Sequence, residues 1–89
     1  MRLDGRVAIV AGAGSGIGAA IAQRFAAAGA QVIAADIGRA SVDALAAQVT
    51  GLTAHTCDVT DSAAVDALVD SAVQRFGRLD VMVNNVGSA

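Results

Sequence analysis

A glycine-rich segment at residues 11–18 constrains the fold of this chain more than any other feature of the sequence. It reads AGAGSGIG, directly follows the apolar stretch Val7–Val10, and opens an alanine-rich helical pattern that continues to Gly29. Glycines allow a tight turn and a close approach of the backbone to a ligand, and a helix start presents free N–H groups with a partial positive charge. A strand, a glycine-rich turn and a helix in this order predict the phosphate-binding corner of a dinucleotide fold.

The spacing of these glycines fits two phosphate-binding patterns. The first uses Gly12, Gly16 and Gly18, whereas the second uses Gly14 and Gly16 with Ala19 in the third place. Both patterns direct the helix start toward a phosphate, so the functional prediction is the same for either. The alternative interpretation is a tight turn of an α/β fold that binds no ligand.

The composition and charge exclude several classes of protein. The charged residues are 6 arginines and 8 aspartates, which give a net charge of −2. Without a basic cluster there is no electrostatic reason to expect a nucleic-acid partner. No apolar run approaches the roughly 20 residues that a membrane span needs, and no secretory pattern precedes the first predicted strand. Because Cys57 is the only cysteine, we expect neither a disulfide framework nor a cysteine-based metal site, and we expect a cytoplasmic location.

Four strand-like segments alternate with three helical ones. We expect strands at 6–11, 31–36, 53–57 and 80–84, and helices at 16–28, 40–49 and from an N-cap at Thr60 to Phe76. The strand at 31–36 is apolar on both faces, as is typical of a parallel strand that helices cover on both sides. Helical spacing predicts that the first helix buries Ile17, Ile21, Phe25 and Ala28. In the third helix it predicts a buried face of Val65, Leu68, Val69, Ala72, Val73 and Phe76.

This alternation predicts an α/β fold with a parallel, Rossmann-type sheet, right-handed crossovers, and helices on both faces. The expected strand order of 3-2-1-4 places the fourth strand beside the first, with the ligand crevice between their C-terminal ends. Strand 80–84 would then be an apolar edge, which natural proteins rarely leave open. We therefore expect residues 1–89 to be the N-terminal part of a single dinucleotide-binding domain, a truncated doubly wound fold that continues beyond Ala89.

Three charged residues near predicted strand ends are candidates for recognising a dinucleotide. Asp36 ends the second strand 18 residues after Gly18; its carboxylate can accept hydrogen bonds from both adenosine ribose hydroxyls, and it would repel the extra phosphate of NADP. This favours NAD, although Arg39 is near enough in sequence to reach a 2′-phosphate, so that NADP is the weaker alternative. Asp58 lies near the expected adenine position, but it fits equally well as a turn residue before Thr60.

Other polar residues have weaker functional interpretations. Asn84 and Asn85 follow the fourth strand, where a pair of amides can tie neighbouring strand ends together and bond a ribose, or simply form a polar turn. We interpret His55 and Cys57 as structural, because no second histidine is present to complete a metal site. Ser88 has no partner base and is not expected to be a nucleophile.

Together these motifs resemble the N-terminal part of the short-chain dehydrogenase/reductase family, over the whole length of the chain. The family's Thr-Gly-x-x-x-Gly-x-Gly motif matches residues 11–18, its acid after the second strand matches Asp36, its Asp-Val pair matches residues 58–59, and its Asn-Asn-Ala-Gly motif matches residues 84–87. The segments Leu3-x-Gly5-Arg6-Val7 and Phe76-Gly77-x-Leu79-Asp80 also fit. The chain departs from the family at Ala11, where the family has Thr, and at Val86, where it has Ala.

The resemblance implies a role for each matching residue. The pyrophosphate and the nicotinamide side of the coenzyme would be held by Gly12, Ser15, Gly16, Ile17 and Gly18. The adenosine ribose would be bound by Asp36, the adenine by Asp58 and Val59, and the nicotinamide ribose region by Asn85. The family's catalytic Asn, Ser, Tyr and Lys follow the Asn-Asn-Ala-Gly motif, and this chain contains neither Tyr nor Lys. No catalytic residue is therefore assigned, and Asn84 and Asn85 do not match the catalytic Asn.

By this resemblance we expect an NAD-dependent oxidoreductase that transfers hydride between nicotinamide and a small alcohol or ketone, commonly as a homo-oligomer. Residues 1–89 alone are expected to bind coenzyme weakly and to show no turnover. One alternative is a short nucleotide-binding or regulatory module without catalysis, assembled through its fourth strand. Another is a Rossmann methyltransferase, which the Asn84-Asn85-x-Gly87 segment and the glycine spacing disfavour.

Overall fold

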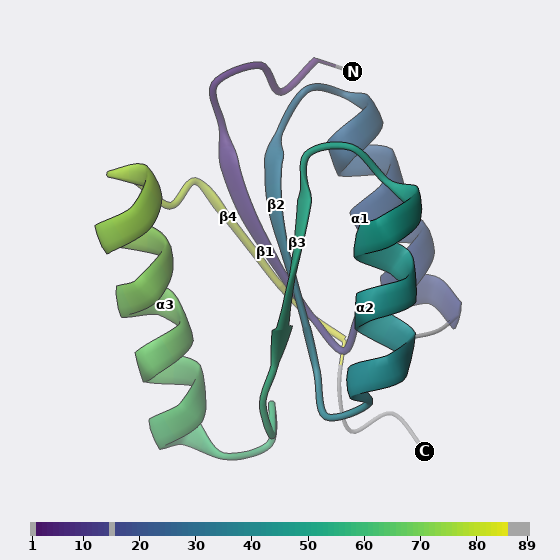
Figure 1. Ribbon diagram of the computed structural model, residues 1–89. Coiled ribbons are helices and arrows are strands. Elements are labelled where there is room, and N and C mark those ends of the chain that lie inside the picture. The colour runs from purple at the N-terminus through teal and green to yellow at the C-terminus, as the bar shows by residue number, and fades with distance from the viewer. Residues whose placement is uncertain (1, 15, 86–89) are drawn as a thin grey trace.

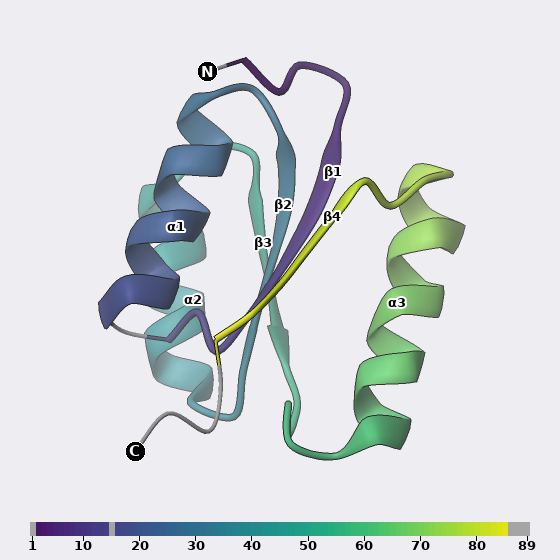
Figure 2. The same cartoon turned by 180° about the vertical axis from the view of Figure 1, so that it is seen from behind.

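The four strands form one parallel sheet in the order β3-β2-β1-β4, as predicted from the alternation of elements. The computed structural model describes residues 2–14 and 16–85. The strands are β1 (Val7–Ala11), β2 (Gln31–Asp36), β3 (Leu52–Thr56) and β4 (Val81–Asn84), and the helices are α1 (Gly16–Ala27), α2 (Arg39–Gln48) and α3 (Ser62–Phe76). Helices α1 and α2 cover one face of the sheet and α3 covers the other (Figures 1 and 2). The expected element bounds differ from these by one residue at some ends.

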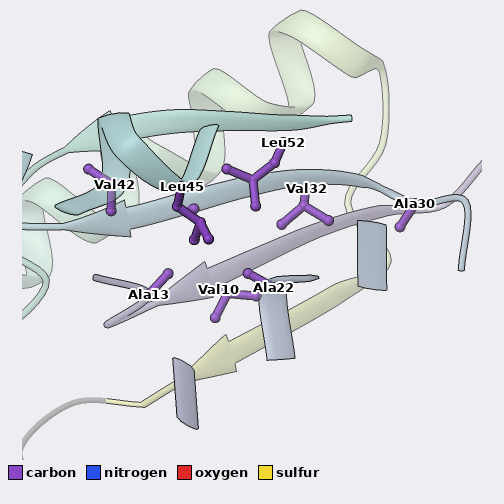
Figure 3. Close-up of a cluster of buried hydrophobic side chains, with 9 residues drawn as sticks. Val10, Ala13, Ala22, Ala30, Val32, Val42, Leu45 and Leu52 are labelled. Atoms are coloured by element: carbon purple, nitrogen blue, oxygen red, sulfur yellow. The ribbon is translucent and has the colours of Figure 1, made fainter. Parts of the chain in front are cut away.

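Both faces of the central strands are buried, which explains why these strands are apolar without alternation. All five residues of β1 are buried, and so are the four residues 32–35 of β2. Alternate side chains point to opposite faces of a strand. Thus Val10 and Val32 pack toward α1 and α2 (Figure 3), whereas Ile9 and Ile33 belong to the cluster that α3 covers.

Small and branched side chains fill the space between the sheet and helices α1 and α2. Ala22 of α1 and Val42 of α2 are fully buried against the sheet, and Leu45 lies beside them (Figure 3). The predicted buried face of α1 is wrong at Ile17, which is 71% exposed. The residue of the first turn that is buried is Gly18, and because successive helical residues point about 100° apart, its neighbour is turned outward.

Helix α3 covers the other face through Leu68 and Ala72, both fully buried as predicted. The prediction is wrong at Val73, which is 45% exposed, whereas Val69 and Phe76 are partly buried against the same cluster as Leu68 and Ala72. The N-cap is Asp61, not Thr60: the Asp61 carboxylate accepts a hydrogen bond from the Ala63 N–H at 3.0 Å. The helix ends at Gly77, as predicted.

Asp80 fixes β4 against β1 at the N-terminal edge of the sheet. Its carboxylate accepts hydrogen bonds from the Val7 N–H at 2.8 Å and from the Arg78 guanidinium at 2.7 and 2.9 Å, while its own N–H donates to the Val7 carbonyl. The hydrogen bonds from Arg78, first, and from Val7 lower the pKa of Asp80 from 3.8 to about 2. The resulting register places Asn84 level with Ala11 at the opposite, C-terminal edge.

Candidate functional site

The strand ends next to the described candidate residues lie at the C-terminal edge of the sheet. In the strand register Ala11 is level with Ala35 on one side and with Asn84 on the other. Asp36 is level with Thr56 of β3. The turn after β1, the acid after β2 and the amides after β4 therefore lie along one edge, as the strand order requires. No pocket is found among the described residues.

The glycine turn brings the start of α1 directly against the end of β1. The N–H groups of Gly12 and Ala13 both donate to the Ala35 carbonyl, at 2.8 and 3.1 Å. Gly12 and Gly16 have φ angles of 81° and 61°, in the left-handed region that favours glycine. A Cβ on Gly18 would lie 2.0 Å from the Gly12 carbonyl oxygen, so only glycine fits there. The positions that require glycine are thus those of the first predicted pattern, Gly12, Gly16 and Gly18. Ser15 lies outside the described residues.

The carboxylate of Asp36 faces this turn. One of its oxygens accepts a hydrogen bond from the Gly14 N–H at 2.8 Å, and the other accepts one from the Gly38 N–H at 3.0 Å. The Asp36 carbonyl also accepts from the Cys57 N–H at 3.0 Å, which joins the ends of β2 and β3. The acid that the sequence singled out is therefore bonded to the glycine turn, at the place where the fold brings the two segments together.

Two large apolar side chains are exposed in the segments that form this edge. Ile17, in the first turn of α1, is 71% exposed, and Ile37, directly after Asp36, is 68% exposed. Ile17 was a predicted site residue, whereas sequence reasoning missed Ile37. The signal that could have found it is an isoleucine in a loop directly after the candidate acid. Both side chains offer apolar surface beside groups that suit phosphate and sugar.

The segment after β3 forms a turn that is held by hydrogen bonds between its own residues. The Asp58 carboxylate accepts hydrogen bonds from the Thr60 hydroxyl at 2.6 Å and from the Thr60 N–H at 3.0 Å, and these lower the pKa of Asp58. The Val59 side chain is buried under α3, so only its backbone is available to a ligand. Burial, followed by the charges of Asp58 and Asp36, raises the pKa of the Cys57 thiol. This geometry fits the turn interpretation of Asp58 directly, whereas its role toward adenine stays a prediction.

Asn85 ties β4 to β1 beside the start of α1. Its N–H donates to the Ala11 carbonyl at 2.9 Å. Its side-chain nitrogen would be 3.0 Å from a Cβ on Gly18, so it lies close to the first turn of the helix. This hydrogen bond is made by the backbone, so the prediction that the side-chain amides tie neighbouring strand ends together and bond a ribose stays a prediction. Val86, Gly87 and Ser88 lie outside the described residues.

Arg39, the candidate for binding a 2′-phosphate, is directed along its own helix. Its guanidinium lies 3.5 Å from the carboxylate of Asp43, one helical turn further on, and both side chains are exposed. Such an exposed pair is weak and does not hold the arginine in one position. Within residues 2–14 and 16–85, no three His, Cys, Asp or Glu side chains are grouped to hold a metal ion. No helix in the same ranges is long and apolar enough to cross a membrane.

The geometry agrees with comparisons to known proteins. The family model described as short chain dehydrogenase matches residues 6–89. The chain belongs to the short-chain dehydrogenase/reductase family. Among curated members it is 50% identical to a D-threitol dehydrogenase of Mycolicibacterium smegmatis and 43% identical to a 3-oxoacyl-[acyl-carrier-protein] reductase of Thermotoga maritima. These alignments cover 99% and 98% of this chain but 35% and 37% of the relatives, so the chain spans little more than a third of their length.

Solved structures of the family have the same arrangement of elements. A hydroxysteroid dehydrogenase from Escherichia coli superposes with a TM-score of 0.91 at 40% identity, over 98% of this chain and 39% of that one. A 7α-hydroxysteroid dehydrogenase complexed with NADH and 7-oxo glycochenodeoxycholic acid also gives a TM-score of 0.91, over 98% of this chain and 36% of that one. The resemblance inferred from the motifs is therefore confirmed at the level of family and fold.

Proposed function

We propose that this chain forms the NAD-binding part of an oxidoreductase that interconverts an alcohol and a ketone by hydride transfer. The observation that carries the proposal is the contact between the glycine turn and Asp36, through the 2.8 Å hydrogen bond from the Gly14 N–H. In the proposal the start of α1 binds the anion and the Asp36 carboxylate binds the sugar, and this contact supports the proposal because it joins the two segments. A dinucleotide needs both within the length of one ADP unit.

The donor set suits such a coenzyme. Gly12 and Gly18 approach so closely that a Cβ on Gly18 would lie 2.0 Å from the Gly12 carbonyl oxygen, which brings the turn directly against the N-terminal end of α1. A pyrophosphate bound there would accept hydrogen bonds from backbone N–H groups and would be favoured by the helix dipole. In the proposal Gly12, Ser15, Gly16 and Gly18 hold this group, with Ile17 and Asn85 on the nicotinamide side. When bound, the nicotinamide supplies or accepts the hydride.

The charge at Asp36 supports NAD over NADP. A carboxylate accepts hydrogen bonds but cannot donate them, so it pairs with two ribose hydroxyls and repels a phosphate esterified to one of them. Arg39, which would favour NADP, is exposed, its guanidinium lies 3.5 Å from the Asp43 carboxylate, and within the described residues it makes no ion pair with Asp36. Two neighbours in the family are named as complexes with NADH, the 7α-hydroxysteroid dehydrogenase and a 3-ketoacyl-(acyl-carrier-protein) reductase from Brucella melitensis.

The proposal names only a broad class of substrate. The relatives are named for polyol, steroid and oxoacyl substrates, and we propose a small-molecule alcohol or ketone without choosing among them. Catalytic residues are proposed to lie outside these 89 residues, so residues 1–89 alone should show no turnover. A homo-oligomeric state and a cytoplasmic location stay predictions from the sequence.

The test is a calorimetric titration of the whole protein with NAD and with NADP. We expect tighter binding of NAD, and a loss of about tenfold or more in NAD affinity in Asp36→Ala, because hydrogen bonds to a charged group are lost. Asp66→Ala, on the exposed side of α3, is the matched control and should bind NAD like the unsubstituted protein. Tighter binding of NADP would contradict the preference. S-adenosylmethionine binding without NAD binding would favour the methyltransferase alternative.

A further inference from the structure

Two glycines hold the same carboxylate but have different surroundings. Gly14 and Gly38 each donate their backbone N–H to one oxygen of Asp36, at 2.8 and 3.0 Å. A carboxylate has about four lone-pair positions, so two of them remain for a ligand. These two match the number of hydroxyl groups on an unmodified adenosine ribose. The orientation of Asp36 thus depends on the two glycine N–H groups.

Gly14 is required for space and not for its backbone conformation. Its φ is not among the positive values recorded for glycines of this chain, so its backbone would accept an L-residue. A Cβ on Gly14 would, however, lie 2.8 Å from both the Cγ and the Oδ2 atom of Asp36, and 3.3 Å from Oδ1. The colliding atoms are the end of a side chain, which can rotate away. An alanine at residue 14 would therefore displace the carboxylate and leave the fold intact.

Gly38 lacks this constraint although it makes the equivalent hydrogen bond. Its φ is −78°, an ordinary value for any residue. A Cβ there would lie 3.6 Å from Asp36 and 3.7 Å from the Ser41 hydroxyl, which are normal van der Waals contacts. An alanine at residue 38 would therefore keep both the N–H donor and the position of the carboxylate.

We propose that Gly14 is a specificity-determining residue, because the absence of its Cβ allows the carboxylate of Asp36 to dock on the glycine turn in the orientation that accepts an unphosphorylated ribose. The inference rests on the proposed function, since it concerns how the same site distinguishes NAD from NADP. It adds that the discrimination depends on a glycine of the phosphate-binding turn as well as on the acid. Gly14 acts through Asp36, so it is a positioning residue.

The experiment compares Gly14→Ala with Gly38→Ala in calorimetric titrations with NAD and NADP. In Gly14→Ala we expect NAD affinity to fall about tenfold, the effect of one misplaced charge-assisted hydrogen bond, while NADP affinity stays equal or rises. In Gly38→Ala both affinities should stay within about twofold, because the hydrogen bond is kept. Thermal melting of both variants shows whether the fold is preserved. Equal effects of the two variants on the NAD-to-NADP ratio would overturn the proposal.

A second measurement needs neither a glycine variant nor coenzyme. In amide proton NMR spectra, Asp36→Asn should move the resonance of Gly14 or Gly38 upfield, because an amide offers one acceptor oxygen where the carboxylate offers two. Unchanged resonances of both glycines would show that they do not hold the carboxylate, and would overturn the proposal. Failure of the proposed function is distinguishable: the unsubstituted protein would bind no NAD while the NMR shift persisted.

Discussion

The substitution Gly18→Ala tests whether the close contact between α1 and the turn is needed for both the fold and the site. The added Cβ would lie 2.0 Å from the Gly12 carbonyl oxygen and 2.9 Å from its carbon, and protein Cβ atoms essentially never approach closer than 3.0 Å. The helix start or the turn must therefore move by about 1 Å. Because the colliding atoms are backbone, no rotamer change can relieve the contact.

The expected effects are large for one added methyl group. Overpacking of this kind costs about 1–3 kcal/mol of unfolding free energy, and a shift of about 1 Å in a site can cost on the order of a hundredfold in its function. Urea denaturation measures the first effect and calorimetric titration with NAD the second. Gly38→Ala, where the added Cβ meets nothing closer than 3.6 Å, is the control and should change neither. If Gly18→Ala kept both its stability and its NAD affinity, the argument for the close approach would be refuted.

Three further predictions concern the parts of the fold that support the site. Leu68 is fully buried, so Leu68→Ala should lower the unfolding free energy, measured by urea denaturation, by about 2–5 kcal/mol. Val73 is 45% exposed, so Val73→Ala should change the unfolding free energy by at most about 0.5 kcal/mol. Asp61→Ala should lower the unfolding free energy by about 1 kcal/mol, because the N-cap of α3 is lost, and Thr60→Ala should lower it by less. If urea denaturation showed a larger loss for Thr60→Ala, the N-cap would be Thr60, as predicted from the sequence. Since Asp80 has a folded pKa of about 2 against an ordinary 3.8, its ionised form stabilises the fold above pH 3.8, and this contribution is lost as the pH falls through about 2. The stability difference between Asp80→Asn and the unsubstituted protein should therefore be constant at neutral pH and shrink as the pH falls from about 3.8 through about 2. A constant difference at all pH values would contradict it.

The sheet could be predicted from the sequence because its pattern is set locally. Strands such as 32–35, apolar on both faces, are typical of parallel strands between two helical layers, and the alternation with helices then leaves few topologies. The family could also be inferred, because its motifs lie at strand ends that this topology brings to one edge. Those predictions needed only residue type and spacing.

The errors and omissions have a common physical cause, which is that they depend on how two segments approach each other. Helical spacing alone places Ile17 on the buried face, but the close packing of Gly18 turns it outward. Thr60 and Asp61 are both good capping residues, and the choice was decided by the hydrogen bond of Thr60 to Asp58. The contact of Gly14 with Asp36 joins residues 22 positions apart.

The most direct test of the account is a crystal structure of the protein with NAD bound. The account predicts the pyrophosphate at the N-terminus of α1, between the glycine turn and Asn85, with both oxygens of Asp36 accepting hydrogen bonds from the adenosine ribose. NAD bound elsewhere on the molecule, or an Asp36 carboxylate turned away from the ribose, would contradict it.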